Sequence, residues 1–242
     1  MTIRAFNEAA RALVMWISIQ SDVARHSGSD TERRAAEDRM GLLTPVIKGV
    51  LTDLGFANTV TAQQVFGGHG YIRESGMEQF VRDARIPMIY EGANGIQALD
   101  LVGRKLGKDG GRALMAFLNE IGGFIKEKNA DASMKPFVTP LGVALGHLQQ
   151  ASMWFMQNAM AKPDNAGAGA TDYLQMFGLV ALGYMWCLIA QAALAKQADA
   201  RMKAKLITAR FFMERMLPET AAQLARIKSG ADAVMELPDE AF

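Results

Sequence analysis

Apolar positions along the chain follow the period of an α-helix rather than that of a β-strand. In the first segment they recur every three or four residues, at Ile3, Phe6, Ala10, Leu13 and Ile17. This spacing places them on one helical face and predicts an amphipathic helix over residues 2–26. No segment alternates apolar and polar residues over the length of a useful strand. The chain is therefore expected to be all-α.

The same periodicity continues through the next forty or so residues. A second helix is expected to begin near Asp30, with a kink at Pro45, where a backbone donor is missing. Gly55 is expected to interrupt this helix, and a third helix should then run to Phe66, where a pair of glycines stops it.

The rest of the chain predicts further helices separated by short breaks. They cover residues 76–84, a segment from about Ile96 to Leu106, and residues 111–128, 139–161, 173–197 and 199–230, the last as one helix or two. Lys108–Gly111 has the composition of a boundary, and Lys162–Ala170 has that of a flexible linker. The expected fold is an up-and-down four-helix-bundle-type domain over residues 1–107, followed by a second helical bundle over residues 110–242.

Charge and cysteine content exclude several classes of function. The net charge is +1 with no basic patch, so nucleic acid is not expected as a partner. Cys187 is the only cysteine, and the three histidines have no partner at helical spacing, so we expect neither a disulfide nor a metal site. The single cysteine favours a reducing, cytoplasmic location, and the first ten residues lack the apolar run of a signal peptide.

One apolar segment allows two interpretations. Residues 173–195 contain no charged side chain, and their number matches a bilayer span. Two glutamines and two glycines lie within the segment, however, and a central helix covered by other helices has the same composition. We expect a buried helix and do not expect a membrane as a partner.

The residue best suited to chemistry is Glu91. Apolar and aromatic residues precede it over Ile86–Tyr90, and three of the next four residues are glycine or alanine. An isolated glutamate on a loop is usually only solvated. Apolar neighbours, however, raise the pKa of a carboxyl group, and small neighbours let a ligand approach the backbone closely. Both conditions suit a general base that removes a proton from carbon.

Two other groups of residues have a structural and a functional interpretation. The glycines of Gly67–Gly70 follow a predicted helix and lack the dinucleotide-binding spacing, so they are either a helix stop or a place where backbone amides contact a phosphate or cofactor. Arg82, Asp83 and Arg85 form a charge cluster that is expected to make structural ion pairs.

The segment Gln64–Gln97 resembles the C-terminal signature of the acyl-CoA dehydrogenase family. It combines a Q-x-x-G-G-x-G-Y turn, an R-D-A-R-I run, an I-Y-E-G sequence and a final I-Q. The form YEGANGIQALDLVGRKL resembles the long members with an extra C-terminal helical domain, such as the 3-methylmercaptopropionyl-CoA dehydrogenases. Residues 3–106 are similar to the family's C-terminal helical domain, and residues 110–242 are similar to the extra domain.

The resemblance implies a role for individual residues. Glu91 matches the base that removes the α-proton of an acyl-CoA thioester while the β-hydrogen leaves as hydride to FAD. The positions that match substrate contacts are Tyr90 and Gly92, and those that match FAD contacts are Gln64, Val65, Gly68, Ala93 and Gly95. The family often has threonine where this chain has Ala93, which removes one hydroxyl from the FAD site.

The resemblance also implies partners. These are an acyl-CoA substrate, an electron-transfer flavoprotein as electron acceptor, and further copies of the chain in a homo-oligomer. The family's N-terminal and β domains have no counterpart in this sequence, so domain 1–107 is expected to be incomplete at its N-terminal end and the chain to be inactive alone. The alternative is a non-catalytic helical module for oligomerisation or interaction.

Overall fold

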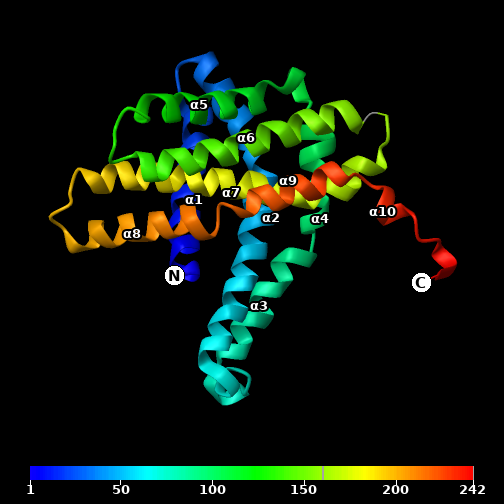
Figure 1. Ribbon diagram of the computed structural model, residues 1–242, viewed down its shortest axis with the longest axis horizontal. Coiled ribbons are helices and arrows are strands. Elements are labelled where there is room, and N and C mark those ends of the chain that lie inside the picture. The colour runs from blue at the N-terminus through cyan, green and yellow to red at the C-terminus, as the bar shows by residue number, and fades with distance from the viewer. Residues whose placement is uncertain (160, 242) are drawn as a thin grey trace.

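The computed structural model describes residues 1–159 and 161–241. All regular elements in these residues are helices, which confirms the predicted all-α class (Figure 1). The helices are α1 Thr2–His26, α2 Asp30–Phe66, α3 Met77–Ile89, α4 Asn94–Asp100, α5 Arg112–Lys128, α6 Lys135–Asn158, α7 Asp164–Leu194, α8 Ala200–Arg215, α9 Glu219–Ser229 and α10 Asp232–Met235.

Helix α7 is the centre of the molecule (Figure 1). It packs against α1, α2, α4, α6, α8 and α9, and every residue from Met176 to Cys187 is buried, whichever face of the helix it lies on. A helix that is covered on every side has no need of a polar face, which explains the uncharged run in the sequence. Two helices, Asp30–Gly70 and α7, are long and apolar enough to cross a membrane, but 72% of the most apolar window of α7 is buried inside the chain.

Two glycines let α2 and α7 approach closely. A Cβ atom added at Gly178 would lie 2.5 Å from a methyl group of Val50, and one added at Gly49 would lie 2.5 Å from a methyl group of Leu174. At Gly178 the overlapping atoms belong to the stiff, β-branched Val50, so only glycine fits there, whereas at Gly49 the end of the flexible Leu174 side chain would have to move. The contact joins the first half of the chain to the second through one continuous apolar core.

The structure corrects several predicted helix boundaries. Helix α2 contains Pro45, as predicted, but it continues through Gly55 without the expected interruption, because a single glycine costs only about 1 kcal/mol within a helix that is supported by packing. Helix α3 extends to Ile89, five residues beyond its expected end. The predicted end of α2 at Phe66 is confirmed, where Gly67 adopts a φ of +61°.

The predicted linker Lys162–Ala170 is wrong for most of its length, since α7 begins at Asp164. The small residues are there for close packing rather than for flexibility. A Cβ atom at Gly169 would lie 2.8 Å from the Phe155 ring, and Ala170 is fully buried. Linker composition and a tight helix–helix contact therefore look alike in sequence.

The second part of α2 and the antiparallel α3 leave the body of the molecule as a helical arm (Figure 1). We call the segment 54–89 the arm. The expected ion pairs among Arg82, Asp83 and Arg85 do not form in the described residues; Asp83 instead accepts a hydrogen bond from Gln79 at 2.7 Å. Residues one or two positions apart in a helix point in different directions, which explains this result.

Candidate functional site

The loop with Glu91 joins α3 to α4 and spans residues 90–93. Helix α3 ends at Ile89, Tyr90 is extended, and Gly92 takes a φ of +73° that disfavours any other residue. The side-chain amide of Gln97 donates to the Gly92 carbonyl at 3.0 Å and closes the loop on the first turns of α4. The tight turn predicted around Glu91 is thus present.

Glu91 is exposed, as are the apolar residues that precede it, Ile89 and Tyr90. The sequence favours a carboxylate shielded by these neighbours, and the structure does not provide that shielding from within the chain. The loop lies between the end of α3 and the start of α4, and none of its four residues is buried. Any shielding of Glu91 must come from another surface or from a bound molecule.

A basic side chain lies next to the loop. Lys48 of α2 places its Nζ atom 5.9 Å from the centre of the Tyr90 ring and donates to the Asn94 Oδ1 atom at 2.7 Å. One residue of α2 therefore contacts both ends of the loop. The other predicted residues here are Ala93, half-buried just before α4, and Gly95, exposed with open space around its Cα atom.

The remaining predicted cofactor residues lie elsewhere, at the tip of the arm. Gln64 and Val65 are in the last turn of α2, and Gly68 is in the short 3-10 turn Gly67–Gly70 that follows. All three are exposed. At Gly67 and Gly68 an added Cβ atom would meet nothing within 4 Å, so the backbone is open to a ligand or a partner surface there.

Within one chain, the structure does not bring the predicted cofactor residues at the tip of the arm close to the residues of the Glu91 loop. Helix α3 has 13 residues and separates the tip from the Glu91 loop, a length of roughly 20 Å at 1.5 Å per residue. The loop residues are at the end of the arm that joins the body (Figure 1). A single molecule that contacts both groups would have to span α3 or lie between two copies of the chain.

Sequence reasoning missed the residues that anchor the loop. Asn94, the first residue of α4, has its side chain among Lys48, Thr52 and Asp53 of α2, and Asp53 also accepts from Gln175 of α7. The spacing of Lys48 and Thr52 on one face of α2 is the only signal in the sequence. This spacing gives no indication that Asp53 binds Gln175, which lies 122 positions further along the chain.

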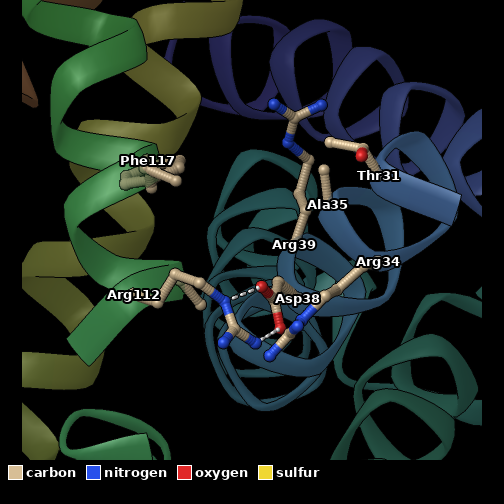
Figure 2. Close-up of a pocket in the computed structure, with 9 residues that line it drawn as sticks. Thr31, Arg34, Ala35, Asp38, Arg39, Arg112 and Phe117 are labelled. Carbon is tan, nitrogen blue, oxygen red and sulfur yellow. Dashed lines mark hydrogen bonds and ion pairs between the residues drawn. The ribbon is translucent and has the colours of Figure 1, made fainter. Parts of the chain in front are cut away.

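A separate pocket lies between α2 and α5, with a volume of about 360 Å³ (Figure 2). Two of the arginines that line it are engaged within the protein: Arg112 binds Asp38 with two hydrogen bonds, and Arg39 pairs with Glu120. None of the predicted site residues line it. In the described residues, no three His, Cys, Asp or Glu side chains gather in a way that could hold a metal ion.

The chain matches two family models along most of its length. Residues 7–106 match the model described as "Acyl-CoA dehydrogenase, C-terminal domain", and residues 117–238 match "Acetyl-CoA dehydrogenase C-terminal like". The second match alone covers half of the chain.

Similar curated proteins have the same family in their names. The chain is 34% identical over 240 residues to 3-methylmercaptopropionyl-CoA dehydrogenase of Ruegeria pomeroyi, covering 97% of this chain and 41% of that protein. It is 29% identical to the broad-specificity linear acyl-CoA dehydrogenase FadE5 of Mycobacterium tuberculosis, covering all of this chain and 42% of that protein. It thus spans about two fifths of these relatives. The chain belongs to the acyl-CoA dehydrogenase family, in the region of its C-terminal domains.

Proposed function

We propose that this chain supplies the general base and part of the cofactor-contacting surface for the α,β-dehydrogenation of an acyl-CoA thioester. The observation that carries the proposal is the position of Glu91. It is the only carboxylate of the turn 90–93, which Gly92 and Gln97 close, in a chain that belongs to the acyl-CoA dehydrogenase family. Its relatives' names specify different acyl groups, so the proposal is limited to the thioester class.

In this reaction Glu91 takes the proton from the α-carbon as the double bond forms. The flavin, when bound, supplies the acceptor for the hydride that leaves the β-carbon. Gly92 has no side chain to cover its backbone amide, so this amide suits polarisation of the thioester carbonyl. Such polarisation lowers the barrier to proton removal. Exclusion of water by the bound substrate would strengthen the base, since Glu91 is otherwise exposed.

The arm tip fits the proposed FAD contact. Gln64, Val65 and Gly68 are exposed there, and the open glycine backbone leaves room for a flat or phosphorylated group. Ala93 and Gly95 form the second group of proposed cofactor residues and would contact FAD near Glu91. Since about 20 Å of α3 separates the two groups, we propose that each belongs to a different cofactor site in a homo-oligomer.

The surface of the arm supports self-association. Large apolar side chains are exposed along both of its helices, at Val60, Val65, Phe66, Tyr71, Ile72, Phe80, Ile86 and Ile89. Exposed apolar residues gathered on one element mark an interaction surface. We further propose an electron-transfer flavoprotein as the electron acceptor and a cytoplasmic location.

The test is the substitution Glu91→Gln in the flavin-loaded enzyme that contains this chain. The amide cannot accept the α-proton, so we expect turnover to fall by about 10²- to 10⁴-fold while FAD stays bound. Glu236→Gln, an exposed glutamate near the other end of the chain, is the matched control and should retain full turnover. Unchanged turnover in Glu91→Gln would reject Glu91 as the base.

The exposed arm also favours a second function, that of a non-catalytic oligomerisation module. The two functions make different predictions for Glu91→Gln and for a variant in which the surface of the arm is disrupted. In the second case Glu91→Gln would not alter turnover, whereas disruption of the arm surface would dissociate the assembly.

A further inference from the structure

The side chain of Asn94 is the most heavily bonded one near the Glu91 loop. Its Nδ2 atom lies 2.6 Å from Asp53 Oδ1, 2.8 Å from Thr52 Oγ1 and 3.1 Å from the Gly49 carbonyl oxygen. Its Oδ1 atom accepts from Lys48 at 2.7 Å. Asn94 therefore fastens the start of α4 to one turn of α2, three residues after Glu91 in sequence.

Asp53 extends this contact into the second half of the chain. One carboxylate oxygen accepts from Asn94, and the other accepts from the Gln175 side-chain amide of α7 at 2.5 Å. A carboxylate that accepts from two amides holds both donors by charge-assisted hydrogen bonds, which are stronger than neutral ones. Helix α7, the central helix, is thus two hydrogen bonds away from the residue that begins α4.

The surrounding backbone leaves little freedom for these side chains. At Gly49, α2 meets α7 through Leu174 and α4 through Gln97, with an added Cβ atom 2.5 Å from the first and 3.7 Å from the second. Lys48, Asn94, Asp53 and Gln175 are all partly buried around this junction. Close contact between three helices at Gly49 leaves the partly buried side chains around it little room to rearrange.

The loop depends on this junction because both of its ends are attached to it. Lys48 contacts Tyr90 at one end and Asn94 at the other, and Gln97 holds Gly92 from within α4. Glu91 itself is exposed and has no buried contact to fix it. Its place in space is therefore set by the residues on either side of it.

We propose that Asn94, Asp53 and Gln175 are positioning residues that hold the Glu91 loop, so that α7 of the second half of the chain sets the geometry of the base. The inference rests on the proposed function for the role of Glu91. The anchoring of the loop is independent of that role and can be measured by itself.

The first test follows amide hydrogen exchange of the loop in the chain as it exists, with no cofactor. Gln175→Met keeps the length of the side chain and removes the donor, and Asn94→Ala removes the anchor. Gln175→Met should raise exchange over residues 90–100 by about tenfold, the effect of one lost hydrogen bond, and Asn94→Ala should raise it further because it removes several. Gln191→Met, an exposed glutamine on the same helix, is the control and should leave exchange unchanged.

A reciprocal variant separates the specific bond from general loosening. In Asp53→Asn/Gln175→Glu the new amide would donate to the new carboxylate, and its oxygen would still accept from Asn94. Exchange at the loop should return toward the original rate, whereas Gln175→Glu alone, which sets two carboxylates against each other, should raise it. The proposal is wrong if loop exchange is unchanged in both single variants, if Gln191→Met raises it equally, or if the reciprocal variant shows no recovery.

The second test uses the flavin-loaded enzyme that contains this chain and an acyl-CoA substrate. Displacement of the base by about 1 Å can cost roughly 10²-fold, so Gln175→Met should lower kcat by about 10- to 10²-fold with KM and FAD content unchanged. The isotope effect on α-proton removal should rise because that step becomes slower. Equal loss in kcat and in FAD content would indicate a structural role and overturn the positioning role. A parent enzyme without turnover would refute the proposed function, while the exchange result would still decide the anchoring.

Discussion

The indole nitrogen of Trp186 donates a hydrogen bond to the backbone carbonyl oxygen of Ala5 at 3.0 Å. Both residues are completely buried, and 181 positions separate them in sequence. The bond joins the first turn and a half of α1 to the C-terminal half of α7. The two segments expected to form separate domains therefore share one core, and a change at this contact affects both.

Trp186→Phe should destabilise the whole chain. It removes the hydrogen bond to Ala5 and leaves a space where the larger ring was, for a combined loss of about 2 kcal/mol. The free energy of unfolding, measured by urea denaturation, should fall by that amount in a single transition. Trp154→Phe, the same replacement at a half-buried position, should cost less than about 1 kcal/mol. Equal losses would contradict the role of the buried bond.

Gly178→Ala should also be destabilising, although alanine is the better helix former. The new methyl group would overlap Val50 at 2.5 Å and push α2 away from α7, at a cost of about 1–3 kcal/mol. Gly146→Ala on α6 is the control, because nothing lies within 4 Å of its Cβ position. It should stabilise the chain by about 0.5–1 kcal/mol. A thermal melt that gives both variants a higher Tm would exclude the close contact.

The pair Asp38–Arg112 should make stability depend on pH. Hydrogen bonds from Arg112 hold the pKa of the Asp38 carboxyl below its ordinary value of 3.8 (Figure 2). A group with a lowered folded-state pKa stabilises the fold above its unfolded value and loses this contribution as the pH falls through the folded value.

A double-mutant cycle of Asp38→Asn and Arg112→Gln measures this effect. The coupling between the two substitutions should be present at about pH 6 and should fade as the pH drops below the ordinary value of 3.8 and through the lowered pKa of Asp38. Coupling that persists in acid would show that charge is not its origin.

Val65→Glu should weaken self-association. This valine is 79% exposed at the tip of the arm, so the change costs the isolated chain little, but a buried charge at an interface is unfavourable. The dissociation constant of the assembly should rise by tenfold or more, which corresponds to about 1.4 kcal/mol, and light scattering should show a shift toward smaller species. Val143→Glu, at an exposed valine on α6, should leave the assembly intact.

Local chemistry in the sequence was enough to predict α1, the end of α2 at Gly67, and the loop that contains Glu91. Each depends on neighbours within a few residues: apolar spacing, a glycine with positive φ, and small residues in a turn. The same rules failed for Gly55, which stays helical, and for the stretch 164–170, which is helical and tightly packed. In both places distant helices determine the conformation, and composition alone does not show them.

Periodicity and motif spacing are local properties, and they are enough to indicate that this protein is helical, that Glu91 lies in a tight turn, and that the chain resembles the acyl-CoA dehydrogenases. Three further facts required the packed helices: Glu91 is exposed, α3 separates it from Gln64 and Gly68, and its loop is anchored through Asp53 to Gln175. These relationships arise where α2, α4 and α7 meet, and the packing of helices far apart in sequence leaves no periodic trace in any one of them.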